Sequence, residues 1–220
     1  TSDGFSATLK TDAPFCVNGL LIGEKEGYFR AEQPISTNEG ITIPLMLEPL
    51  YTLPIRVNVL AGGIIRPLQP TEKAIFTLRH LERDFVVSVV SSHDQATVQL
   101  IAGPYEITSQ LIVKSNPPFR LEEQKIKHCI DTPVDGVLGV IGVTKKTCTS
   151  QTIPAAEYEE VIAGGGTIRW TAQRQDIGTA HGLTLYTVRG NTPTRQSQLG
   201  EIDEMMKKLS PSMSPPRFEQ

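Results

Sequence analysis

The sequence predicts a mainly β protein (α+β), with an antiparallel sandwich or barrel-like core and two short helices in the C-terminal third. Three observations predict this fold class. Short β-branched runs recur between turn residues, which is typical of strands. Hydrophobic residues make up 39% of 220 residues, enough for one sizeable core. Amphipathic helical spacing is confined to the end of the chain, so we expect residues 1–195 to form one β-rich domain and 196–220 to add a helix and a tail.

The centre of the predicted core is the stretch from residue 85 to residue 115. It contains three apolar runs, separated by the polar loop 91–95 and by Gly103-Pro104. This pattern predicts a three-stranded antiparallel meander. Apolar residues fall on both faces of these strands, so we expect the sheet to be covered on both sides.

Further strands are expected on both sides of this stretch. Residues 71–83 suit either a capped helix or a strand, and the β character of the flanks favours the strand. Residues 125–130 alternate as in a half-buried strand, and the glycine-rich run 134–143 predicts another strand. Residues 167–172 and 183–188 are expected to form two strands that pair with each other.

The apolar segment 41–60 is interrupted by Pro44, Pro49 and Pro54. Because proline cannot donate a ladder hydrogen bond, the segment is expected to form edge strands, bulged strands or an extended arm. An arm of this kind often lies over a neighbouring subunit, and an edge strand within the same chain is the alternative. The candidate interaction residues of the arm are Leu45, Leu47, Leu50 and Leu53.

Two helices are expected near the C-terminus. Residues 154–163 begin with a proline and an early acidic residue and are followed by three glycines, which predicts a helix with a glycine cap. Residues 196–209 predict the second helix, whose charges suit the helix dipole. The tail 211–220 has a disordered composition, so order there requires something to hold it, for which we expect a neighbouring chain. The candidate interaction residues of this region are Leu199, Ile202, Met206, Leu209 and Phe218.

No motif for nucleophilic catalysis stands out. Cys16 precedes all four histidines, as in papain-like hydrolases, but lacks the flanking signature. Cys148 follows two lysines that favour a thiolate, yet no base is evident nearby. Ser109 with Lys145, or with the lysine that follows it, is a weak alternative because Ser-Lys pairs are assembled in space. The adjacent pair His128-Cys129 points to opposite faces of its strand, which argues against a dyad.

The sequence predicts no metal site and no cofactor, because the histidines and cysteines are scattered without ligand spacing. The triple glycine follows a predicted helix, which is the wrong order for a phosphate loop. A formal net charge of −3 does not favour nucleic acid as a partner. No apolar run approaches the length of a membrane span. An odd cysteine count and no secretory leader favour a reducing compartment, cytoplasmic or within a virion.

These observations favour a non-enzymatic, self-associating structural protein, most concretely a viral coat, shell or matrix component, that forms a homo-oligomer through its arm and tail. A viral-type Cys or Ser protease is the first alternative. The second is a β-rich adaptor that binds a protein or peptide by adding a strand to an open sheet edge.

Overall fold

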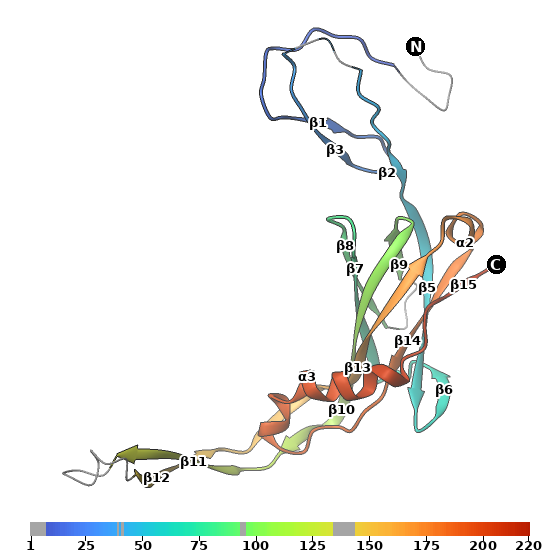
Figure 1. Ribbon diagram of the computed structural model, residues 1–220. Helices are drawn as coiled ribbons and strands as arrows, with labels where there is room; N and C mark the ends of the chain where they lie inside the picture. The colour runs from blue at the N-terminus through green and yellow to red at the C-terminus, as the bar shows by residue number, and fades with distance from the viewer. Residues whose placement is uncertain (1–7, 39, 41, 93–95, 134–143) are drawn as a thin grey trace. The chain divides into compact units, whose positions relative to one another are not determined.

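The structure is a computed structural model that forms two compact units. The first unit comprises Thr1–Tyr51 with Gln99–Ala102, and the second comprises Thr52–Val98 with Gly103–Gln220. Figure 1 shows the strands and helices of both units. The residues that the structure describes are 8–38, 40, 42–92, 96–133 and 144–220.

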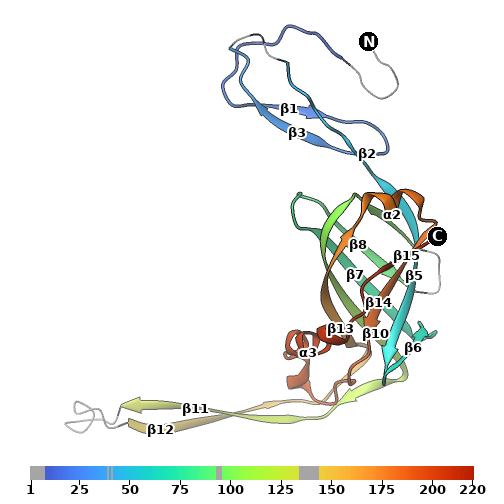
Figure 2. The ribbon, with the colours of Figure 1, turned by 45° about the vertical axis from the view of Figure 1, so that its right-hand side comes forward.

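Two β-sheets that pack face to face make up the core of the second unit (Figure 2). In the first sheet every neighbouring pair is antiparallel. The order of its strands is β13 (Ala156–Ala172), β10 (Gly103–Leu121), β7 (Glu72–His80) and β8 (Val86–Ser91). In the second sheet β14 runs parallel to β5 and antiparallel to β15. The order of its strands is β15 (Arg217–Glu219), β14 (Gly182–Val188), β5 (Tyr51–Ala61) and β6 (Ile64–Pro67), with β9 (Thr97–Leu100) also on β5.

Side-chain alternation explains why these strands form the core. On β7, and on β10 over residues 105–113, every second residue is buried, because successive side chains of a strand point to opposite faces. Ile107 lies opposite Leu78 on one side and Ile168 on the other. Each fully buried aliphatic side chain of this kind contributes about 1.5–3 kcal/mol to folding. The antiparallel sandwich that the sequence predicts is therefore confirmed, as is the strand over residues 71–83.

The three runs of residues 85–115 are strands, but they do not form a meander. β8 pairs with β7, β9 pairs with β5 of the other sheet, and β10 lies between β7 and β13. Turn residues show where the chain reverses, whereas the partner of each strand depends on which inward side chains fill the core. The prediction of strands was right and the prediction of their pairing was wrong.

The proline-broken segment 41–60 contains one interior strand of the second sheet. β5 lies between β14 and β6, so this part of the segment is neither an edge strand nor a free arm. Its pairing with β14 begins at Ile55, one residue after Pro54, so the missing N–H of the proline removes no bond from that ladder. Leu53 is buried in the core.

The helix predicted over residues 154–163 is wrong. Residues 156–172 form β13, and the three glycines lie within this strand instead of capping a helix. A Cβ atom on Gly164 would lie 2.1 Å from the carbonyl oxygen of Val188 on β14. A Cβ on Gly166 would lie 3.2 Å from Ser210. Glycine is needed here because backbone from the other sheet and from the C-terminal region lies directly against β13.

Strands do form at residues 167–172 and 183–188, but they belong to different sheets and do not pair with each other. A short helix that the sequence did not reveal, α2 (Arg174–Thr179), connects them. In the C-terminal helical region, the 3₁₀ helix η1 (Gln196–Leu199) precedes α3 (Ile202–Leu209). Helix α3 packs on β13 and buries Met206, so the predicted helix is confirmed over its second half.

The C-terminal tail is held by its own chain. A second 3₁₀ helix, η2 (Ser210–Ser212), leads to β15, which pairs with β14. Met213 is buried, and the ring of Phe218 lies 5.2 Å from that of Trp170. The hydroxyl of Thr184 donates to the Glu219 carboxylate at 2.6 Å. Order in the tail therefore needs no neighbouring chain, contrary to the expectation from its composition.

β10 and β13 continue beyond the sandwich into a two-stranded ribbon. Its strands are β11 (Gln124–Pro133) and β12 (Thr144–Ile153), paired antiparallel throughout. Residues 125–130 form the predicted strand, but all six are exposed, so the expectation of a half-buried strand is wrong. The strand predicted over 134–143 lies outside the described residues.

In the first unit, β1 (Gly19–Gly23) pairs with β3 (Ala31–Ile35), and β2 (Tyr28–Phe29) pairs with β4 (Glu48–Pro49). None of the described residues between 8 and 51 is buried. Across the described part of the whole chain, no helix is long and apolar enough to cross a membrane.

Candidate interaction surfaces

The cysteines that were candidate nucleophiles are arranged differently from the expectation. Cys129 and Cys148 lie opposite each other on β11 and β12 and form a disulfide. A sulfur in a disulfide is not a nucleophile, so Cys148 is not a thiolate in this structure, and His128-Cys129 is not a nucleophile–base pair. Cys16 is a free thiol and is exposed, and its sulfur lies 3.8 Å from the carbonyl oxygen of Val17.

The structure does not bring Ser109 and Lys145 together. Ser109 is fully buried between the two sheets, where its Oγ lies 3.0 Å from Oγ1 of Thr187. Lys145 is exposed on β12, opposite Thr132. The Ser109 hydroxyl is therefore a polar group satisfied within the core, in an environment closed to substrate.

The disulfide is consistent with an oxidising environment, whereas the sequence favoured a reducing compartment. Disulfides persist in oxidising environments and are rare where thiols are kept reduced. The odd cysteine count was compatible with one disulfide and one free thiol, which is the arrangement found. The pairing could not be derived from the sequence, because it depends on the register of β11 against β12.

We expect exactly one cysteine per chain to react with iodoacetamide when the protein is unfolded without reductant. That residue is Cys16, because the disulfide protects Cys129 and Cys148. After reduction all three should react. Intact-mass measurement counts the modified cysteines in both states. In the control Cys16→Ser, no cysteine should react before reduction and two should react after it. Three reactive thiols without reductant would contradict the disulfide.

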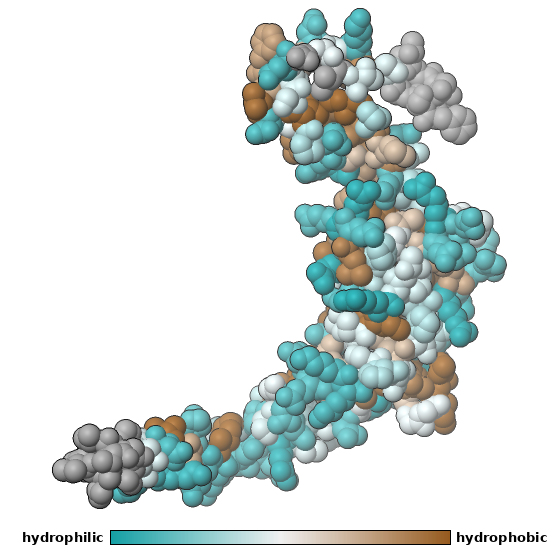
Figure 3. Space-filling model, in the orientation of Figure 1, coloured by the Kyte–Doolittle hydropathy of each residue, from teal (hydrophilic) through white to brown (hydrophobic). Residues whose placement is uncertain are grey.

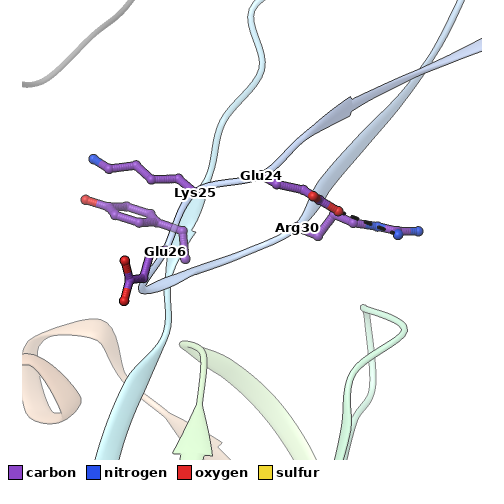
Figure 4. A pocket seen from close by; sticks show the side chains of 5 residues that line it. Glu24, Lys25, Glu26 and Arg30 are labelled. Carbon is purple, nitrogen blue, oxygen red and sulfur yellow. Dashed lines mark ion pairs between the residues drawn. The ribbon is translucent and has the colours of Figure 1, made fainter.

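One pocket, of about 380 Å³, lies in the first unit and is open to solvent (Figure 4). The Nζ of Lys25 lies 4.4 Å from the centre of the Tyr28 ring, and Arg30 lies 3.9 Å from the carboxylate of Glu24. Its charged lining residues are thus largely paired with one another at the surface. Glu26 completes the lining. None of the candidate nucleophiles lines this pocket, so it gives no support to a catalytic function.

The interaction residues predicted from the sequence are mostly used within the chain. Leu53 and Met206 are buried. A Cβ on Gly23 would lie 2.2 Å from Leu45, which shows that this leucine packs over β1. All the remaining candidates are half-buried, namely Leu47, Leu50, Leu199, Ile202, Leu209 and Phe218.

Large apolar side chains are exposed in both units, with Ile64 of the second unit 70% exposed. Those of the first unit are Leu9, Phe15, Val17, Leu20, Ile22 and Met46. Phe15 is 87% exposed and Met46 is 83% exposed, values typical of side chains with no packing partner. Figure 3 shows apolar residues at the surface of this region. The alternation of Leu20 with Ile22 was visible in the sequence, but periodicity alone does not say whether a chain covers such a face itself.

The hairpin arm is the second exposed feature. We use this name for β11 and β12, residues 124–133 and 144–153. Ile126 and Ile130 are exposed on one face of the arm, and Lys125 and Lys127 lie on the opposite face beside Cys129.

Comparison with protein-family models, with curated proteins and with solved structures found no match to this chain. Among the described residues, no group of three or more His, Cys, Asp or Glu side chains is placed to hold a metal ion.

Proposed function

We propose that this chain is a non-enzymatic structural subunit that associates with further copies of itself. The observation that carries the proposal is the first unit, where apolar side chains are exposed and no described residue between 8 and 51 is buried. Half-buried side chains alone give a stretch of this length little apolar burial to offset the conformational entropy of its ordering. A covering partner supplies the missing burial, and exposed apolar patches commonly mark such interfaces.

The hairpin arm supports the same proposal. An isolated two-stranded ribbon is marginally stable at best in water. The arm has only one pairing partner for each of its strands among the described residues, and its disulfide holds the two strands together. A β-sandwich that carries extended segments suits close packing of identical subunits. A viral coat, shell or matrix component is the concrete form of this proposal.

A β-rich adaptor is the second candidate, and one observation favours it. β8 is an edge strand of its sheet, where Val86 and Val90 are each 56% exposed. A peptide added to this edge would bond to the free backbone groups of β8 and contact both valines. A Cys or Ser protease has less support, given the burial of Ser109 and the disulfide at Cys148.

Native mass measured by light scattering over about a hundredfold range of concentration tests the proposal. We expect the mass to rise above that of one chain, 24.1 kDa, as concentration increases. A constant 24.1 kDa over the whole range would overturn self-association and favour the adaptor.

A further inference from the structure

Two segments of the chain are each two-stranded and little buried. One is the N-terminal ribbon, by which we mean residues 8–51 with the β1–β3 pair, and the other is the hairpin arm. Each arm strand, and each of β1 and β3, pairs with a single partner in the part of the chain that the structure describes. The outer edges of both ribbons therefore present backbone groups that a further strand can bond.

The two segments carry opposite charge. The N-terminal ribbon, residues 8–51, contains six acidic and three basic side chains, a net charge of −3. The hairpin arm, residues 124–133 and 144–153, contains four lysines and one aspartate, a net charge of +3, in a chain whose total is −3. The arm is thus locally basic in a protein that is acidic overall. The N-terminal ribbon carries a net negative charge, opposite in sign to that of the arm.

The lysines of the arm are exposed on both of its faces. Lys125 and Lys127 lie on the face of the disulfide, and Lys145 lies on the face of Ile126 and Ile130. Lys146 is directly opposite Asp131, so it has an acidic neighbour within the arm. The other three lysines have no acidic residue opposite them in the register.

Two glutamates also follow the exposed apolar side chains of β1 in the N-terminal ribbon. Leu20 and Ile22 are exposed on β1, and Glu24 and Glu26 follow directly in the turn. Glu24 is 70% exposed. This surface resembles the arm in its exposed branched apolar side chains. Lys25 and Arg30 lie beside these two glutamates, so the charge match comes from the acidic excess of the ribbon as a whole.

We propose that the N-terminal ribbon of one copy binds the hairpin arm of another copy. The contact combines apolar burial, lysine–carboxylate pairing and strand addition at the open ribbon edges. It rests on the proposed self-association and specifies its surfaces. Because two different surfaces meet, the contact can be made twice across a two-fold axis in a closed dimer, or be repeated from copy to copy in a ring or filament.

Charge exchange between copies tests the contact. In the arm variant, Lys125, Lys127 and Lys145 are each changed to Glu. In the ribbon variant, Asp12, Glu24 and Glu26 are each changed to Lys. Each variant alone places like charges on the two surfaces, so we expect the concentration needed for half-association to rise about tenfold or more. A mixture pairs the acidic arm with the basic ribbon and the basic arm with the acidic ribbon, so mixing equal amounts should restore association.

A matched control carries the same change of charge outside both segments. Arg174→Glu, Lys207→Glu and Lys208→Glu alter three exposed residues of α2 and α3, and association of this variant should stay within about twofold of the parent chain. Association of the parent should also weaken as salt is raised from about 0.05 M to about 0.5 M. The far-ultraviolet circular dichroism of every variant should match the parent and show that the sandwich is intact.

The outcomes separate this contact from the proposed function. If both variants associate as the parent does, or if the mixture stays dissociated, the ribbon–arm contact is wrong although self-association stands. If the parent chain is itself a monomer at every concentration, both proposals fall. Restoration in the mixture alone supports the contact and shows that it lies between chains, since a contact within one chain gains nothing from mixing.

Discussion

Replacing Gly165 with alanine is expected to destabilise the protein by about 3 kcal/mol or more. Gly165 lies on β13 with φ of +140°, a conformation that L side chains rarely adopt. The added Cβ would also lie 2.2 Å from the backbone carbonyl oxygen of Ser109 on β10, which pairs with β13. Both strain and overlap have to be relieved by moving the paired backbone of β13 or of the interior strand β10, and equilibrium unfolding in urea measures the loss of stability.

Gly200→Ala is the matched control for this substitution. Gly200 has φ of −77°, and its added Cβ would have only an ordinary contact, 3.5 Å from the carbonyl oxygen of Ser197. We expect the urea midpoint of this control to change little. Equal effects of the two substitutions would mean that β13 does not approach β10 as closely as the structure shows.

Glu72 is expected to make a large contribution to the stability of the folded protein, and this is the second prediction with a large effect. Its side chain is fully buried and accepts two hydrogen bonds of 2.7 Å from Arg66, with a further ion pair to Arg189. The backbone N–H of Gln69 donates a fourth bond at 3.0 Å. Burial opposes ionisation and is the largest single influence, but these hydrogen bonds and the charge of Arg66 together outweigh it and lower the pKa of Glu72 to about 2.

The lowered pKa makes stability depend on pH in the acid range. Because the folded pKa lies below the ordinary value of 4.5, the contribution of Glu72 is fully present above pH 4.5 and is lost as pH falls towards 2. A difference of this size corresponds to about 3 kcal/mol. Glu72→Gln should remove a similar amount at pH 7 by leaving Arg66 and Arg189 without their carboxylate, and it should flatten the acid part of the curve.

Urea unfolding at a series of pH values tests this prediction. Glu160→Gln is the control, since Glu160 pairs with Lys73 at the surface, where its side chain is 40% exposed. Surface pairs of this kind contribute about 1 kcal/mol or less. A variant Glu72→Gln that is as stable as the parent at pH 7 and still loses stability in acid would show that another carboxylate is responsible.

Only part of the candidate surfaces could be predicted from the sequence. Lys125 and Lys127 were expected on a half-buried strand, whereas they are exposed, and Cys16 and Cys148 were considered as candidate nucleophiles. Their environments were not predictable, because the disulfide depends on Cys129 and Cys148 being opposite each other in the register of β11 and β12. The burial of Ser109 likewise depends on the second sheet, which lies over it and supplies Thr187.

The sequence by itself determined the β class, most strand positions and the amphipathic face of α3. These features follow from the spacing of apolar residues within each short segment, which does not depend on the rest of the chain. Tertiary structure alone decided that β9 joins the other sheet, that β5 is interior despite Pro54, and that residues 156–172 form a strand. The physical reason is the same in each case: pairing partners and close backbone contacts are set by burial between segments far apart in the chain, which outweighs local propensity.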